Sequence, residues 1–86
     1  MPLFYLNLCN GQGFLEDEEG EDYVDLAAAT QAAIKGLREA MAADLLKGRW
    51  NSGSYMEIED AQHQHLVTIQ FGDIVEIETV CVRKAR

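Results

Sequence analysis

The residues best placed to do chemistry are the carboxylates of residues 16–25, EDEEGEDYVD, where seven acidic side chains fall in ten positions. An EF-hand calcium loop needs an oxygen ligand at its first position, glycine at its sixth and a carboxylate at its twelfth. With Gly20 as the sixth residue, the first and the twelfth are Leu15 and Leu26. The segment is therefore not an EF-hand loop, because the side chains at both ends are apolar.

Three other interpretations of residues 16–25 stay open. A looser divalent-cation site could use Asp17, Glu19 and Glu21, and a solvated turn needs only like charges that keep the surface hydrated. The third interpretation is a surface that binds a protein partner or imitates nucleic-acid phosphate, although mimicry needs carboxylates spread over a longer surface. The residues that we predict to contact a partner here are Asp17, Glu18, Glu19, Glu21 and Asp22.

His63 and His65 form the second group with potential chemistry. Their i, i+2 spacing puts two imidazoles on the same side of a strand, a geometry that zinc or copper can use. Two ligands are too few for a site, and the sequence assigns no third one. Surface polar residues are the simpler interpretation, so we predict no cofactor and keep the two histidines as metal candidates only.

Trp50 and Tyr55 flank the loop that follows a predicted helix, next to Arg49. Tryptophan, tyrosine and arginine are the residues that most often anchor protein interfaces. We therefore include Trp50 and Tyr55 among the predicted partner-binding residues. The alternative for Trp50 is a structural role, in which it covers the end of the core.

The sequence holds no recognisable catalytic motif. Gly11-Gln12-Gly13 continues with Glu16 where a dinucleotide-binding loop has its third glycine, and no helix is predicted to start there. Cys9 and Ser54 lack the sequence context of a catalytic nucleophile with its base. We therefore predict a protein without enzymatic activity.

Length and charge limit the classes of function. The 86 residues, 48% of them hydrophobic, suffice for one small domain over residues 1–86, without a deep cleft. The formal net charge is −8, and residues 1–34 hold seven acids and no Lys or Arg, whereas residues 83–86 carry three bases. This distribution disfavours binding to nucleic acid or to an anionic membrane, and it favours a basic protein partner.

A cytoplasmic location is predicted from what the sequence lacks. There is no apolar run long enough to span a membrane, and the start MPLFY has neither the basic residues nor the apolar core of a signal peptide. In a reducing compartment, Cys9 and Cys81 are expected to be buried thiols rather than a disulfide. The sequence leaves open whether the two cysteines meet.

The first half of the chain predicts a β-hairpin followed by one long helix. Residues 3–9 and 14–16 are predicted strands, joined by a glycine-containing turn. Asp25 is a good N-cap for a helix over residues 26–47, and Gly48 is a good residue to end it. Apolar residues at spacings of three and four give this helix one apolar stripe, which comprises Ile34, Leu37, Met41 and Leu45.

The second half predicts two strands and a third β-prone segment. Residues 55–60 and 67–71 alternate between apolar and polar side chains, as strands with one buried face do. Residues 74–82 are predicted as a further strand, with a short helical turn just after Gly72 as the alternative. The expected fold is α+β, a small antiparallel sheet of four to five strands in the order ββαββ with one long helix on one face. Its open face and edges favour a homodimer.

The order of these features resembles an uncharacterised family of short stand-alone alphaproteobacterial proteins that carry a domain of unknown function. The similarity covers about residues 3–78, and the motifs that carry it are Phe4 to Gly11, Asp17-Glu18-Glu19-Gly20, Asp25-Leu26, Gly48, Ile58-Glu59-Asp60, Phe71, Asp73 and Val75-Glu76-Ile77. Asn7 stands where many members have His. The resemblance implies a small α+β domain and no particular reaction.

The leading hypothesis is a non-enzymatic adaptor or regulatory module, acting as a homodimer, that binds a protein partner through the acidic segment 16–25 and the open sheet. One alternative is an acidic inhibitor that competes with nucleic acid for a basic enzyme. Another is a metal-binding protein that uses His63, His65 and nearby carboxylates.

Overall fold

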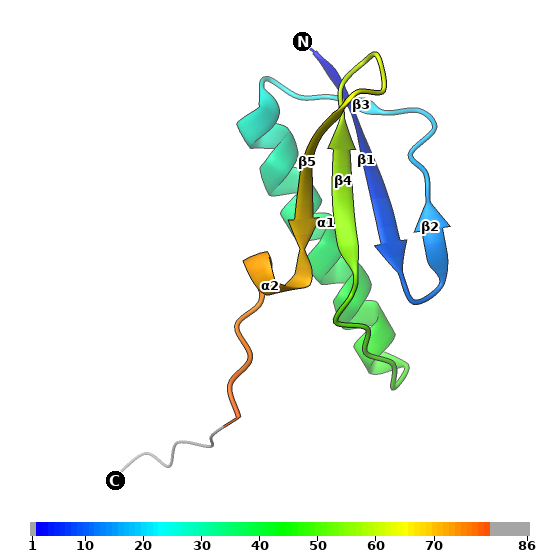
Figure 1. Cartoon of the computed structure of the whole chain (residues 1–86), viewed down its shortest axis with the longest axis vertical. Helices are drawn as coiled ribbons and strands as arrows, with labels where there is room; N and C mark the ends of the chain where they lie inside the picture. Colours follow the sequence, from blue (N-terminus) through cyan, green and yellow to red (C-terminus); the bar gives the residue numbers. More distant parts are fainter. Residues whose placement is uncertain (1, 80–86) are drawn as a thin grey trace, which may run out of the picture.

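The computed structural model describes residues 2–79, and it confirms the predicted α+β fold. An antiparallel sheet forms one layer, and the long helix packs across one of its faces (Figure 1). The elements in chain order are β1 (Leu3–Asn10), β2 (Gly13–Leu15), β3 (Glu21–Asp22), α1 (Leu26–Leu46), β4 (Tyr55–Glu59), β5 (His65–Gln70) and α2 (Phe71–Ile74).

β1 organises the sheet. The strand order is β2-β1-β4-β5, and β1 pairs antiparallel with β4 in a register that joins Tyr5 to Glu59 and Cys9 to Tyr55. The opposite edge of β1 is shared, because β2 pairs with its last residues and β3 with its first ones. The sequence did not predict β3, since two residues are too few to show the alternation of a strand.

α1 begins and ends close to the predicted residues. Asp25 caps its start with an extended backbone, and its side chain accepts a hydrogen bond of 2.8 Å from the backbone N–H of Ala28. At the other end Gly48 has a φ of 82°, in the left-handed region that favours glycine after a helix. The N–H of Gly48 donates to the carbonyl oxygen of Leu45 at 2.9 Å. The helix ends at Leu46, one residue before the predicted end.

The core lies between α1 and the sheet. Leu37 and Met41 of the predicted stripe are buried, and so are the small residues Ala29 and Ala33, which let the helix approach the sheet closely. The prediction is wrong for Leu45, which is 56% exposed, because the last turns of α1 extend past the ends of the strands (Figure 1). The other buried hydrophobic residues are Phe4, Met56, Ile58, Ile69 and Phe71. The partly buried hydrophobic residues that pack against this core are Leu6, Leu8, Tyr23, Ile34, Val67, Ile74 and Val75.

After β5 the chain folds into the short helix α2. The carboxylate of Asp73 accepts a hydrogen bond of 2.9 Å from the backbone N–H of Gln70, as in a helix capping box. At the end of α2, Nη2 of Arg38 donates to the carbonyl oxygen of Ile74 at 2.8 Å. These two polar contacts satisfy backbone groups at both ends of the helix.

The strand predicted for residues 74–82 is therefore not found in its described part. Residues 75–79 form no strand, and the alternative of a helical turn near Gly72 is what the structure contains. Residues 80–86, which include Cys81 and the three basic residues of the predicted tail, lie outside the described residues. Within residues 2–79, no helix is long and apolar enough to cross a membrane.

Candidate partner-binding site

Asp17 anchors the acidic segment to β1. Its Oδ2 accepts a hydrogen bond of 3.0 Å from the backbone N–H of Leu6, and its Oδ1 accepts one of 3.0 Å from the N–H of Gly20. The backbone N–H of Asp17 donates to Oδ1 of Asn7 at 2.8 Å. Asn7 is only 1% exposed, so its amide must find partners inside the fold. Asp17 thus fills the gap between β2 and β3 along the edge of β1.

Gly20 lets the acidic segment turn back towards β1. Its φ is 73°, and a Cβ atom at this position would lie 3.0 Å from the carbonyl oxygen of Phe4 and 3.0 Å from Cε1 of Tyr5. The positive φ and the close approach both favour glycine. Within the DEEG motif, the first and last residues therefore hold the turn, and the two glutamates between them are exposed.

The turn borders a shallow depression that we call the acidic hollow. Its volume is about 390 Å³, and the residues that line it are Glu16, Asp17, Glu18, Glu59 and His63. The first three belong to the connection between β2 and β3, Glu59 is the last residue of β4, and His63 lies in the turn before β5. Segments that are distant in the sequence therefore meet at this hollow.

His63 forms an aromatic side of the acidic hollow. Its ring stacks on Tyr5 with the ring centroids 4.2 Å apart and the planes inclined by 22°. Its Nδ1 lies 3.1 Å from Oε1 of Glu59. The backbone of His63 has a φ of 61°, and its N–H donates to the carbonyl oxygen of Asp60 at 2.9 Å, which defines the turn. The imidazole is 61% exposed, so a ligand could reach it.

The acidic hollow offers negative charge beside an aromatic surface. The carboxylate of Asp17 is already engaged by backbone N–H groups, whereas Glu16 and Glu18 are exposed. Carboxylates and aromatic faces are the groups that bind guanidinium and ammonium ions best. Among residues 2–79, no group of three or more His, Cys, Asp or Glu side chains is arranged to hold a metal ion. Its exposed glutamates and its imidazole ring suit the hollow to a cationic side chain.

His63 and His65 have separate surroundings. His63 precedes β5, whereas His65 is the first residue of that strand, and its Nε2 lies 2.7 Å from Oγ1 of Thr68. The prediction that both imidazoles lie on one side of a strand is wrong, because His63 is held in the turn by its left-handed backbone.

Glu21 and Asp22 lie outside the acidic hollow, on β3. They pair with Phe4 and Leu3, and their side chains are exposed. Next to them the ring of Tyr23 packs against Phe4, with 6.2 Å between the ring centroids. Burial raises the pKa of Tyr23 above its ordinary value, and the nearby carboxylate of Glu21 raises it further.

Trp50 and Tyr55 take part in different contacts. Trp50 packs edge-on against Phe71, with 5.2 Å between the ring centroids, and it remains 47% exposed. Together with Arg49 it lines a hollow of about 250 Å³ near the end of α1. Tyr55 does not line that hollow; it pairs with Cys9 across β1 and β4, and a hydrogen bond to the Cys9 side chain raises the pKa of Tyr55.

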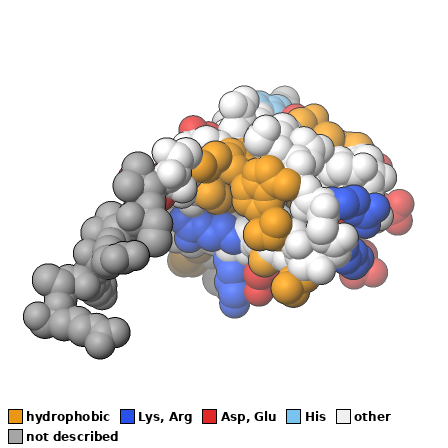
Figure 2. Space-filling model, turned by 90° about the horizontal axis from the view of Figure 1, so that it is seen from below, with side chains coloured by type: hydrophobic (Ala, Val, Ile, Leu, Met, Phe, Trp, Pro, Cys, Tyr) orange, Lys and Arg blue, Asp and Glu red, His pale blue; other side chains and the backbone are white. Residues whose placement is uncertain are grey.

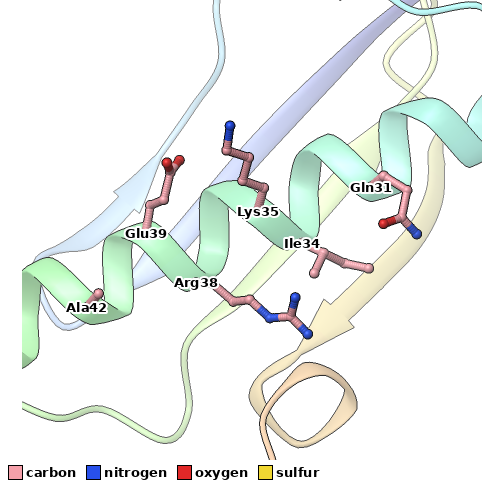
Figure 3. Close-up of a pocket in the computed structure, with 6 residues that line it drawn as sticks. All are labelled: Gln31, Ile34, Lys35, Arg38, Glu39 and Ala42. Carbon is pink, nitrogen blue, oxygen red and sulfur yellow. The ribbon is translucent and has the colours of Figure 1, made fainter.

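A further hollow, of about 330 Å³, lies on the outward face of α1. The six residues that line it all come from this helix: Gln31, Ile34, Lys35, Arg38, Glu39 and Ala42. Lys35 and Glu39 point to one side of the helix axis, and Ile34 and Arg38 to the other (Figure 3). Its lining carries charges of both signs from a single element, so the acidic hollow is the better candidate site.

A family model for a domain of unknown function, DUF6894, matches residues 3–72. The chain belongs to the DUF6894 family. The matched region contains every strand found among residues 2–79 and the whole of α1, so the acidic hollow lies within the DUF6894 domain. The match confirms the resemblance to a family with a domain of unknown function, whereas the alphaproteobacterial range and the stand-alone architecture stay predictions. No curated protein and no solved structure matches the chain.

Sequence reasoning did not find Tyr5, Asn7 and Glu59 as parts of this region of the DUF6894 domain. The sequence could have indicated a role for Asn7, because an amide within the apolar strand LFYLNLC must be hydrogen-bonded when it is buried. No sequence pattern indicates Tyr5 or Glu59, since their proximity depends on the register between β1 and β4.

Proposed function

We propose that this DUF6894 domain is a non-enzymatic interaction or regulatory module that binds a basic segment of a protein partner in the acidic hollow. The observation that carries the proposal is that Glu16, Glu18 and Glu59 share one hollow with His63, whose ring stacks on Tyr5. An Arg or Lys side chain that enters this hollow would meet carboxylates and an aromatic face together.

The charge distribution of the chain supports a basic partner. The formal net charge is −8, which attracts a positively charged protein over several ångströms and speeds its association. Glu19, Glu21 and Asp22 lie outside the hollow and extend the negative surface around it. We expect these three residues to steer the partner, and Glu16, Glu18 and Glu59 to contact it.

The test is the affinity of the protein for a labelled arginine-rich peptide, measured by fluorescence anisotropy at low and at high salt. We expect salt to weaken binding, and Glu18→Lys to raise the dissociation constant at least about tenfold. Glu39→Lys is the matched control, because it makes the same change in net charge on an exposed position of α1, away from the acidic hollow. Equal losses in both variants would refute the site and leave only a general charge effect.

Competition with nucleic acid for a basic enzyme is the second candidate function. The same exposed carboxylates of residues 16–22 could occupy a phosphate-binding surface. Addition of DNA or RNA to the complex distinguishes the two functions. Nucleic acid would displace an inhibitor from the phosphate-binding surface of its enzyme, whereas it would not displace an adaptor that binds another surface of its partner. A metal-dependent function has less support, since His63 and His65 are held in separate contacts; stoichiometric metal after dialysis would favour it.

We propose further that the module acts in the cytoplasm and as a homodimer. Support for self-association comes from the sheet, because α1 packs on one face only and β2 and β5 carry the exposed hydrophobic side chains Phe14, Leu15 and Leu66. The mass in solution, measured by light scattering across a concentration series, tests the dimer directly.

A further inference from the structure

The end of α1 forms a surface whose chemistry is opposite to that of the acidic hollow. The side chain of Leu46 is 90% exposed, that of Leu45 56% and that of Trp50 47%, and Lys47 and Arg49 are exposed beside them. We call these five residues the α1 tip. Figure 2 views this end of the molecule and shows hydrophobic side chains next to those of Lys and Arg. Exposed apolar groups gathered in this way mark contact surfaces.

The described part of the chain leaves the α1 tip exposed, although Trp50 packs edge-on against Phe71. The last turn of α1 extends past the ends of the strands (Figure 1), and Leu45 and Leu46 at the end of this helix are exposed. Among residues 2–79, neither Lys47 nor Arg49 forms an ion pair. His63, which lines the acidic hollow, belongs to the turn between β4 and β5. This turn and the end of α1 lie at opposite ends of the sheet (Figure 1), so the tip cannot reach the hollow of the same copy.

We propose that the α1 tip of one copy binds in the acidic hollow of a second copy, head to tail. The two bases of the tip meet the glutamates of the hollow, and Trp50 supplies a flat apolar surface for the His63 ring. The inference rests on the proposed function of the hollow, and it names another copy of the chain as the source of the basic segment.

The tip is the basic surface that fits best among the described residues. Four bases lie within residues 2–79, and only Lys47 and Arg49 stand within three residues of an exposed aromatic side chain, that of Trp50. Arg38 is already engaged with the carbonyl oxygen of Ile74 at the end of α2. A head-to-tail contact uses two different surfaces, so each complex keeps one free tip and one free hollow. It differs from the sheet-mediated homodimer proposed above, because it can add further copies as the concentration rises.

Sedimentation velocity across a concentration series at low and high salt tests this contact. We expect the wild-type protein to associate at low salt, and Arg49→Glu and Glu18→Lys each to weaken association at least about tenfold. Each variant keeps one functional surface, because Arg49→Glu has an intact hollow and Glu18→Lys an intact tip. An equimolar mixture of the two should therefore form one-to-one complexes and nothing larger.

Further variants separate this contact from other causes. Leu46→Asn removes apolar surface from a side chain that is already 90% exposed, so it should weaken association without unfolding the protein. Glu39→Lys is the control for net charge, and circular dichroism checks that each variant folds. A wild-type protein that stays monomeric at every concentration overturns the inference, and so does a mixture without one-to-one complexes. Binding of the arginine-rich peptide to the Arg49→Glu variant tests the hollow separately, so that failure of self-association and failure of the proposed function are distinguishable.

Discussion

Asp17→Ala tests whether the acidic segment is held by one internal carboxylate. The substitution removes the acceptors of two backbone donors, the N–H groups of Leu6 and Gly20. Glu19→Ala is the matched control, because it removes the same charge from an exposed residue of the same turn. Asp17→Asn keeps one acceptor oxygen and should lie between the two.

The expected loss follows from these two hydrogen bonds. A hydrogen bond to a charged group contributes about 1.5–3 kcal/mol, and the full value applies only where water cannot replace the lost partner. Both bonds of Asp17 are partly buried, so we expect Asp17→Ala to lower the free energy of unfolding by about 2–4 kcal/mol. Domains of this size have about 4–13 kcal/mol in total, so the loss would be a large share.

Urea unfolding, followed by Trp50 fluorescence and by the circular dichroism of α1, measures this loss. Trp50 packs against Phe71 and therefore reports on the core. We expect the midpoint to fall in Asp17→Ala with an unchanged slope, and Glu19→Ala to stay within about 0.5 kcal/mol of the wild type. If Asp17→Ala and Glu19→Ala were equally stable, the carboxylate would not be holding the turn.

Three further predictions concern single residues. Gly20→Ala should lower the free energy of unfolding by about 1–3 kcal/mol, and by more than Gly13→Ala does. Both glycines have a positive φ, but only at Gly20 do other atoms lie within 4 Å of the new Cβ. Thermal unfolding of the two variants measures the difference. The raised pKa of Tyr23 means that its contribution to stability is complete below the ordinary pKa of about 10 and is lost as pH rises through the folded value. Tyr23→Phe should therefore reduce the loss of stability between about pH 8 and pH 11, as measured by urea unfolding. Arg38→Ala removes both hydrogen bonds to the end of α2, so amide hydrogen exchange in α2 should accelerate while global stability falls by less than about 1.5 kcal/mol.

Local patterns were sufficient to predict most of the fold. The N-cap at Asp25 and the spacing of Leu37 and Met41 located α1, since both signals depend on neighbours along the helix. Leu45 misled the prediction, because the same spacing continues past the point where the sheet ends. The β-prone residues after Gly72 also misled it, since the capping by Asp73 and the contact with Arg38 favour α2 there.

The candidate site was predictable only in part. The sequence drew attention to the acidic segment, yet it did not distinguish Asp17, whose carboxylate is bonded inside the fold, from the exposed Glu18. Nor could it join Glu59 and His63 to that segment, because their proximity arises from the pairing of β1 with β4. Spacing along the chain is informative within one element, but not across a sheet.

The position of α1 in the chain has a consequence for how the domain folds. β1 and β4 are neighbours in the sheet, although the whole of α1 lies between them in the sequence, so their pairing must close a long loop. The hairpin of β1 and β2, with the Asp17 turn, joins residues about ten apart and can form within microseconds, as can α1. We therefore expect the pairing of β1 with β4 to limit the folding rate. During synthesis on the ribosome, the hairpin and the helix can form early, but the core cannot pack until β4 has emerged.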